Sequence, residues 1–196
     1  RYMDKQTQVA LASKNGIKTP ASEKIKIGKE RHSFNKFPCI VKPLESINGG
    51  KKINICHNNE ELDTALNGYQ LGSLVLIQEF IEKDYEIVID GLSVNDDIII
   101  PGYIYKFREI AGGTSFSRTG LLSDIPTETV NAIRLMIKEI SYEGLFGVEL
   151  IVSKGEYYFI EINLRNDATT YSFAVAGVNL PALYVQAKTE NIQCEE

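Results

Sequence analysis

The chain has 196 residues, of which 43% are hydrophobic and 24% are charged, proportions typical of a globular protein that is long enough to bury a sizeable core. Its net charge of −5 argues against non-specific nucleic-acid binding, which depends on clustered Lys and Arg, so we expect no nucleic-acid partner. No apolar run approaches the roughly 18 residues of a membrane span, and we expect no membrane partner either.

The three cysteines, Cys39, Cys56 and Cys194, show no C-x-x-C spacing, and the chain has two histidines, so a zinc site is not favoured. An odd and sparse cysteine count is typical of a reducing compartment, which predicts a cytoplasmic location. The sequence begins at Arg1 without an initiator Met, and we expect a fragment of a longer protein.

The first elements are a helix over residues 4–15, with Asp4 as its N-cap and Asn15-Gly16 as its stop, and an extended connection to Pro20. Short strands follow over residues 38–41 and 52–56. Between them Gly49 and Gly50 allow backbone N–H groups to approach phosphates closely. The spacing is not that of a Walker loop, and a simple turn remains the alternative.

A helix begins after Asn58 or Asn59 and runs to Tyr69, and a strand over residues 74–77 continues into residues 78–81. An adenine ring needs apolar faces with one backbone donor and one backbone acceptor. A strand of this kind provides both without special side chains.

Two strands then extend over residues 85–108, with a turn near Asn95 and an edge or bulge at Pro101. A loop follows whose glycines and hydroxyls could present donors to an oxyanion, with Lys106 and Arg118 adding positive charge. An ordinary mobile loop has the same composition. The loop residues at issue are Gly112, Gly113, Thr114 and Ser115. Helices are expected from Thr127 and, capped by Asn179, near the end of the chain.

The most informative stretch is residues 144–165, two strands joined by a tight turn that contains Gly155. A three-residue loop over 154–156 would pair Ser153 with Tyr157 and therefore Glu149 with Glu161. One face would then be hydrocarbon, and we expect it to hold Phe146, Val148, Leu150, Val152, Tyr158, Ile160, Ile162 and Leu164.

The opposite face of this hairpin would carry Glu149, Glu161, Asn163 and Arg165. Like charges opposed across a ladder are destabilising, and a hard divalent cation would explain them, because Mg²⁺ prefers oxygen ligands and uses one or two carboxylates plus substrate phosphates. Two alternatives remain. The face could be merely solvated, or a two-residue loop could place the two glutamates on opposite faces.

The stretches 147–150 and 161–165, whose glutamates stand twelve residues apart, resemble the metal-binding signature of the ATP-grasp superfamily, of carboxylate-amine ligase or carbamoyl-phosphate-synthase type. The resemblance implies that Glu149 binds one Mg²⁺, Glu161 bridges two and Asn163 binds the second. It also implies that Arg165 stabilises the transferring phosphoryl group. The common family form has Pro at the position of Leu164, and this difference leaves every liganding residue type in place.

The same resemblance extends over nearly the whole chain. It implies that Lys5 and Lys42 reach the nucleotide phosphates and that residues 46–51 form a lid. The hinge at residues 78–81 would meet adenine through the Glu79 carbonyl and the Ile81 amide, and Glu86, with Glu82 as the fallback, would bind the ribose. The implied nucleotide-binding residues are thus Lys5, Lys42, Gly49, Gly50, Glu79, Phe80, Ile81 and Glu86. Residues 112–115 would face the γ-phosphate and the acceptor. Lys106 and Arg165 would be the catalytic residues.

The implied fold is α+β, with two lobes of mainly antiparallel sheet plus helices that clamp ATP. Residues 1–20 would be a helix and linker from a preceding, missing domain. Residues 21–80 would form the first lobe, and residues 81–196 the second lobe with the metal site.

The implied activity is an ADP-forming ligase that phosphorylates a carboxylate for attack by an amine. Its cofactors would be ATP and two Mg²⁺ ions, with Mn²⁺ as a substitute, and its partners small-molecule carboxylates and amines; a homodimer is allowed. A nucleotide-binding module without chemistry and a phosphotransferase that stops at the phosphorylated product are the alternatives.

Overall fold

The computed structural model describes residues 5–44, 53–110 and 113–190. The chain divides into two compact units. One is Pro20–Glu82, and the other joins Arg1–Thr19 to Lys83–Glu196. Each unit is built on its own antiparallel sheet. This is the α+β architecture expected from the sequence. Among the described residues, no helix is long and apolar enough to cross a membrane.

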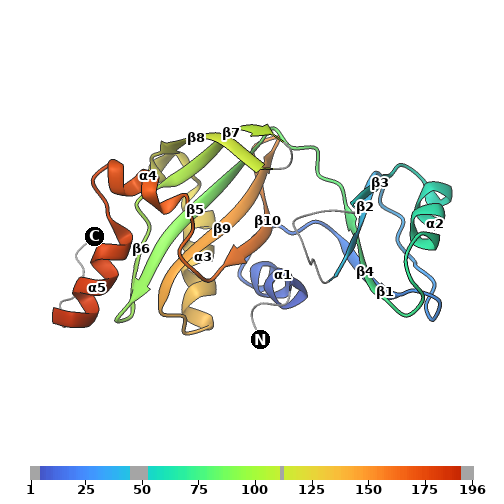
Figure 1. The fold of residues 1–196 in the computed structure, drawn as a ribbon, viewed down its shortest axis with the longest axis horizontal. Coiled ribbons are helices and arrows are strands. Elements are labelled where there is room, and N and C mark those ends of the chain that lie inside the picture. The colour runs from blue at the N-terminus through green and yellow to red at the C-terminus, as the bar shows by residue number, and fades with distance from the viewer. Residues whose placement is uncertain (1–4, 45–52, 111–112, 191–196) are drawn as a thin grey trace. The chain divides into compact units, whose positions relative to one another are not determined.

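The Pro20–Glu82 unit is a four-stranded sheet with one helix packed against it (Figure 1). Its strand order is β1 (Ser22–Lys26), β4 (Leu74–Glu79), β2 (Cys39–Pro43) and β3 (Asn54–Cys56), and its helix is α2 (Asn59–Asn67). The predicted cap of this helix is confirmed, because Asn58 Oδ1 accepts a hydrogen bond from the Glu61 amide at 2.9 Å. Leu62 and Leu66 bury the apolar face of the helix.

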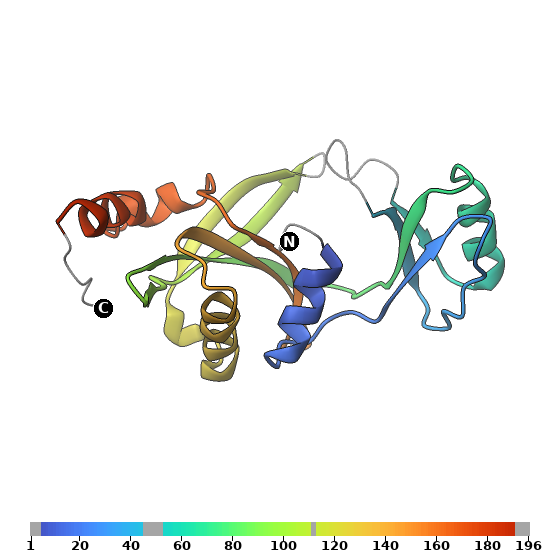
Figure 2. The ribbon, with the colours of Figure 1, turned by 90° about the horizontal axis from the view of Figure 1, so that it is seen from below.

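The other unit holds a six-stranded antiparallel sheet, which Figure 2 shows from its edge. The strand order is β10 (Glu156–Asn163), β9 (Gly144–Ser153), β5 (Tyr85–Val94), β7 (Tyr103–Ile110) and β8 (Gly113–Gly120), and β6 (Asp97–Ile99) also pairs with β5. The two faces of this sheet are covered differently. Helices α1 (Lys5–Lys14) and α3 (Thr127–Glu139) pack on one face, with Leu11, Ile133 and Met136 in the same cluster as Ile87, Val148 and Phe159.

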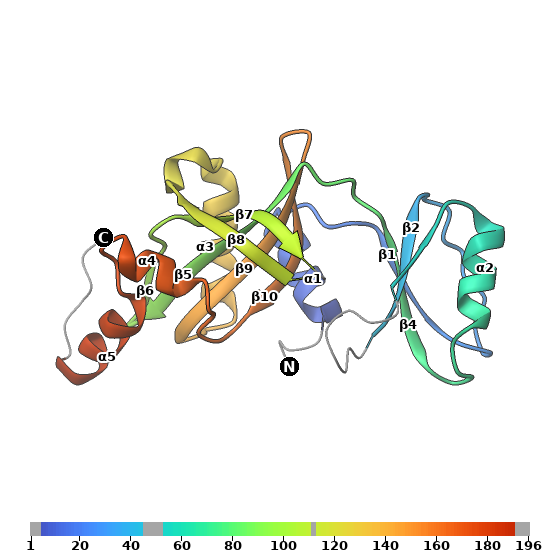
Figure 3. The same cartoon turned by 45° about the horizontal axis from the view of Figure 1, so that its top comes forward.

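The opposite face of the six-stranded sheet is covered by α4 (Thr170–Val175) and α5 (Leu180–Glu190) over part of its length (Figure 3). Phe173 of α4 packs on Val88 and Ile104, and Leu180 of α5 packs near Leu92. Asn179 caps α5 as predicted, since its Oδ1 accepts from the Ala182 amide at 3.1 Å. The charged residues expected from the sequence lie further along this face.

Three elements differ from the sequence expectations. Strand β1 was not predicted, because its sequence is mostly charged and Ile25 is its one buried residue. Strand β8 occupies most of a stretch that was predicted to be a loop, because its backbone completes a ladder with β7 that composition does not reveal. The single strand expected after Asn95 is two strands, β6 and β7, interrupted around Pro101.

The turn between β9 and β10 is shorter than predicted, yet the predicted pairing of the two glutamates is present. Lys154 and Gly155 form a two-residue turn with φ of 51° and 79°, so Ser153 pairs with Glu156. A β-bulge between Phe159 and Glu161 then shifts the register and restores Glu149 opposite Glu161.

Because of the same bulge, the buried face of β10 differs from the apolar face that was predicted. Before the bulge, Phe159 rather than Tyr158 or Ile160 points into the core, where it is 1% exposed. After the bulge, Ile162 is buried as expected. Tyr158 and Ile160 are only partly buried, so placing them in the core was wrong.

Candidate active site

The predicted metal and catalytic residues of β5, β7, β9 and β10 lie on one face of the six-stranded sheet. Glu149 pairs with Glu161 on one side and with Val88 on the other. Glu86, two residues before Val88, pairs with Lys106 of β7. Because side chains alternate along strands, these carboxylates and this lysine share a face.

Lys106 neutralises two of these carboxylates. Its Nζ lies 2.6 Å from Glu149 Oε2 and 3.4 Å from Glu86 Oε2, and its side chain is 12% exposed. Burial alone would lower the pKa of Lys106, but the hydrogen bond and charge of Glu149, together with Glu86, outweigh it and raise the pKa. Lys106 is therefore a charged lysine held between two glutamates.

The side-chain amide of Asn163 contacts both of the opposed glutamates. Its Nδ2 lies 3.4 Å from Glu149 Oε1 and 3.4 Å from Glu161 Oε1. On the far side, Lys5 Nζ of α1 lies 3.3 Å from Glu161 Oε2. Each glutamate thus has one oxygen near a lysine and the other near the Asn163 amide.

Arg165 lies just beyond β10 and is largely exposed. Its Nη2 is 3.4 Å from Asn163 Oδ1, and its Nη1 is 3.3 Å from Asp167 Oδ2 and donates to the Asn166 carbonyl at 3.2 Å. The guanidinium is thereby tied both to the metal-ligand candidate Asn163 and to the chain that follows it.

Glu86, the predicted ribose ligand, is held by two lysines. Lys83 Nζ lies 2.8 Å from its Oε1, and Lys106 Nζ approaches its Oε2. Ribose hydroxyls that bind Glu86 would therefore share its carboxylate oxygens with Lys83 and Lys106, or would displace these lysines.

The predicted residues of the Pro20–Glu82 unit lie on adjacent strands of its sheet. Lys42 Nζ donates to Gln78 Oε1 at 2.8 Å, and Gln78 is nearly buried. The Glu79 carboxylate accepts from the Ala21 amide at 3.1 Å. Phe80, which directly follows β4, is 37% exposed. Ile81 comes next in the chain and is partly buried.

The predicted glycine-rich and hydroxyl-rich loop residues are only partly described by the structure. Gly49, Gly50 and Gly112 lie outside the described residues. Gly113, Thr114 and Ser115 belong to β8, where the backbone of Gly113 and Thr114 pairs with Ile110 and Glu109.

The profile of the ATP-grasp domain matches residues 3–169 of the chain, which is most of its length. The chain belongs to the ATP-grasp family. This family assignment agrees with the two antiparallel sheets and with the resemblance carried by Glu149, Glu161, Asn163 and Arg165.

This ATP-grasp chain has relatives among known enzymes. It is 30% identical over 189 residues to the carbamoyl phosphate synthase large chain of Clostridium beijerinckii, which covers 90% of this chain and 17% of that protein. The 2-oxoglutarate carboxylase biotin carboxylase domain dimer of Hydrogenobacter thermophilus, solved with MgADP, ADP and bicarbonate, has a TM-score of 0.76 at 21% identity, covering all of this chain and 47% of the other. The D-alanine–D-alanine ligase of Bacillus anthracis, solved with ATP, has a TM-score of 0.67 at 22% identity, covering 94% of this chain and 65% of the other. The chain spans less than half the length of the curated relatives it matches.

The donor set of this ATP-grasp chain suits a hard divalent cation. Two carboxylates from adjacent strands converge on one amide, and carboxylate and amide oxygens are the ligands that Mg²⁺ accepts. A half-turn of the Asn163 amide would present its oxygen to the glutamates, and would turn its nitrogen toward Arg165. Among the described residues, no group of three or more His, Cys, Asp or Glu could hold a metal, so two carboxylates plus an amide is the set to consider.

Gln8 is a residue of this site that sequence reasoning missed. It is buried on α1, and its side chain donates to the Ile162 carbonyl at 3.1 Å and accepts from the Ile162 amide at 3.1 Å. Ile162 lies between the metal-ligand candidates Glu161 and Asn163, so these two hydrogen bonds hold the backbone that carries both residues. A polar residue within a helix gives no sequence signal for this contact.

Asp90 is a second residue that the sequence analysis did not single out. It lies on β5 opposite Gly147 and shares the face that carries Glu86 and Glu149. Burial raises its pKa to about 6, an effect that the Thr169 hydroxyl partly offsets and the charges of Asp167 and Glu149 increase.

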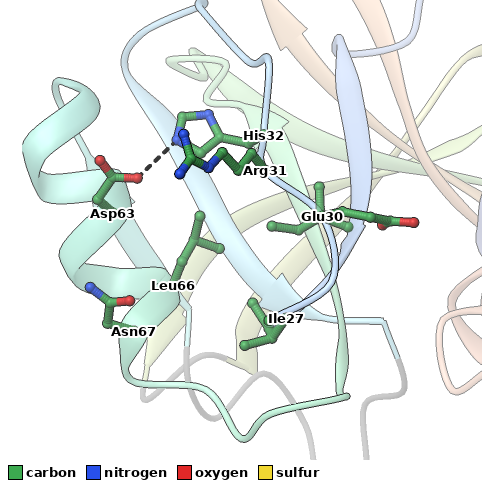
Figure 4. A pocket seen from close by; sticks show the side chains of 9 residues that line it. Ile27, Glu30, Arg31, His32, Asp63, Leu66 and Asn67 are labelled. Atoms are coloured by element: carbon green, nitrogen blue, oxygen red, sulfur yellow. Dashed lines mark hydrogen bonds and ion pairs between the residues drawn. The ribbon is translucent and has the colours of Figure 1, made fainter.

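A hollow of about 480 Å³ in the Pro20–Glu82 unit is lined by none of the predicted site residues (Figure 4). It is bounded by the chain that follows β1 and by α2, where His32 Nε2 lies 3.1 Å from Asp63 Oδ1. Leu66 and Ile27 form its apolar part.

Proposed function

We propose that this ATP-grasp chain carries the nucleotide and metal site of an ADP-forming ligase. The enzyme phosphorylates a carboxylate and passes the acyl group to an amine. The observation that carries the proposal is the direct opposition of Glu149 and Glu161, drawn together by Asn163 and neutralised by Lys106 and Lys5. Such opposition costs stability unless a cation compensates it.

In this proposal Glu149, Glu161 and Asn163 hold two Mg²⁺ ions, for which Mn²⁺ can substitute. When bound, the ions neutralise the β- and γ-phosphate oxygens of ATP. Lys106 must then leave at least one of its two glutamates, and its charge becomes available to the phosphates or the acceptor. Arg165, which is exposed and adjacent to Asn163, faces the transferring phosphoryl group.

The remaining predicted residues would hold the nucleotide. Lys5 and Lys42, with Gly49 and Gly50, contact phosphates, and Glu86 contacts the ribose. Adenine would meet the backbone at residues 79–81. Two neighbouring structures support nucleotide binding, since one was solved with MgADP and the other with ATP.

The proposed reaction has two steps. A carboxylate oxygen of the substrate attacks the γ-phosphorus, and the bond to ADP breaks, which gives an acyl phosphate. The amine nitrogen then attacks the acyl carbon, phosphate leaves with the bonding electrons, and the amine proton passes to solvent. Positioning and charge stabilisation suffice for the first step, because phosphoryl transfer needs little covalent help from the protein.

Hydroxylamine tests this chemistry, because it intercepts an acyl phosphate as a stable hydroxamate. The chain is incubated with MgATP, hydroxylamine and, one at a time, formate, acetate and individual amino acids. Hydroxamate with stoichiometric ADP would support the ligase. AMP with pyrophosphate would indicate adenylation, and nucleotide binding without turnover for every acid would reduce the chain to a binding module.

A homodimer is the proposed assembly, supported by the dimeric neighbour. Sedimentation at several concentrations would return twice the mass of the chain if this is right, and the mass of one chain if it is wrong.

A further inference from the structure

Asp90 carries a buried acidic group on β5. The residue is 0% exposed, and neither carboxyl oxygen is bonded within the described part of the chain. Its neighbours along β5 on the same face are apolar, since Val88 packs with Phe173 and Leu92 packs with Leu180, and the charges of Asp167 and Glu149 disfavour its ionised form. An unpaired carboxyl group between two apolar clusters costs stability, so its presence indicates a role other than stabilising the fold.

The opposite strand makes room for this carboxyl group. Gly147 pairs directly with Asp90, and a Cβ atom at Gly147 would lie 2.8 Å from Asp90 Oδ1. Real Cβ contacts of this length are essentially never seen, so any larger residue would displace the carboxyl group. The glycine opposite Asp90 therefore leaves the space that the carboxyl group occupies.

The Thr169 hydroxyl is the complementary group. Its oxygen is buried and has no hydrogen-bond partner among the described residues either, and it lies close enough to Asp90 to favour the charged form of the carboxyl. The two groups are adjacent but do not meet the geometry of a hydrogen bond. A rotation of the Thr169 side chain would satisfy both at once.

Thr169 belongs to the segment that leads away from Arg165. Within this segment Thr170 Oγ1 lies 2.7 Å from Asn166 Oδ1, and Asp167 is paired with Arg165. Thr169 is followed directly by Thr170, whose hydroxyl oxygen lies 2.6 Å from the Asp167 carbonyl oxygen, so the chain links Thr169 to the residue that is paired with Arg165.

We propose that Asp90 is a positioning residue that binds the Thr169 hydroxyl and thereby holds residues 166–170, and with them Arg165, in place for phosphoryl transfer. The proposal rests on the proposed function for the role of Arg165. Asp90 does not touch the substrate in this scheme. It acts through Thr169 and the ion pair between Asp167 and Arg165.

Steady-state ADP release tests the functional half of the proposal. Asp90→Leu and Thr169→Val each remove one partner, and each should lower kcat by about tenfold, with KM for ATP nearly unchanged. The double variant should be no slower than the slower single variant, because both changes remove the same proposed contact. Asp90→Asn and Thr169→Ser keep a bonding group and should retain most of kcat. Independent effects that multiply, or a raised KM with kcat intact, would overturn the proposal.

Amide hydrogen exchange on the ligand-free chain tests the structural half without any turnover. Asp90→Leu and Thr169→Val should both speed exchange in residues 166–175, while Asp90→Asn and Thr169→Ser should not, and peptides from the Pro20–Glu82 unit serve as the internal control. Unchanged exchange in residues 166–175 in both disruptive variants would overturn the proposal, even in an active enzyme. If exchange responds as expected but the wild-type chain releases no ADP with any acid, the proposed function fails and the contact between Asp90 and Thr169 stands.

Discussion

Replacing Asp90 by Asn should stabilise the folded chain at neutral pH and leave its stability at pH 4 nearly unchanged. The substitution keeps the size of the side chain and removes its ability to ionise. Burial is the main reason that the pKa of Asp90 rises from 3.8 to about 6 in the folded chain. The effect of the variant therefore depends on pH in a direction that can be worked out.

Between pH 4 and pH 6 the folded chain keeps a proton on Asp90 that the unfolded chain has lost. The folded state then binds more protons, so this group lowers stability as the pH rises through that range. The rise from 3.8 to about 6, at 1.36 kcal/mol for each pKa unit, amounts to about 3 kcal/mol above pH 6. Well below pH 3.8 Asp90 is protonated in both states and contributes no difference.

Urea denaturation at pH 4, 5, 6 and 7 measures this effect as the difference in unfolding free energy between Asp90→Asn and wild type. Other carboxylates titrate in both proteins and cancel in the difference. The difference should be near zero at pH 4 and should grow to about 3 kcal/mol in favour of the variant at pH 7. Asp96→Asn, an exposed position in the turn after β5, is the matched control and should give a flat profile. A flat profile for Asp90→Asn would refute the reasoning.

Three further substitutions test the support of the site. Gln8→Ala leaves the buried amide and carbonyl of Ile162 unpaired and should lower the unfolding free energy in urea by about 2–4 kcal/mol. Lys106→Met leaves Glu149 without its lysine, while Glu86 keeps Lys83, and should lower the melting temperature without metal, with a larger recovery on adding Mg²⁺ than wild type shows; equal responses to Mg²⁺ would contradict this. Gly147→Ala forces the Asp90 carboxyl group to move and should cost about 1–3 kcal/mol in the same urea assay, and no loss would show that the site is looser than described.

Local signals in the sequence predicted the ends of several elements well. The side chain of Asn58 caps α2, and Asn179 caps α5, because a cap depends on a few neighbouring residues. The alternation of apolar residues in β9 likewise placed Phe146, Val148 and Leu150 in the core.

The features that the sequence could not predict depend on distant partners. The β-bulge before Glu161 has no signal of its own, and the pairing of Glu149 with Glu161 followed from a wrong turn length that the bulge offset. Strand β8 was predicted to be a loop, because only its ladder with β7 makes it a strand. The contact of Gln8 with Ile162 joins residues 154 positions apart and was not foreseen.

The residue types of the candidate site followed from the sequence, whereas their present partners did not. Glu149, Glu161, Asn163 and Arg165 could be named from spacing and resemblance. That Lys106 neutralises Glu149 depends on the register between three strands, which composition does not encode.

The central claim is that Glu149, Glu161 and Asn163 hold the metal of MgATP, and calorimetric ATP titration with and without Mg²⁺ tests it most directly. Wild type and Glu156→Gln, a control on an exposed residue of the same strand, should both bind ATP more tightly when Mg²⁺ is present. Glu161→Gln keeps the size of the side chain and removes its charge, so it should lose most of that gain and all ADP release. Equal ATP affinity with and without Mg²⁺ in wild type, or an undiminished Mg²⁺ effect in Glu161→Gln, would contradict the account.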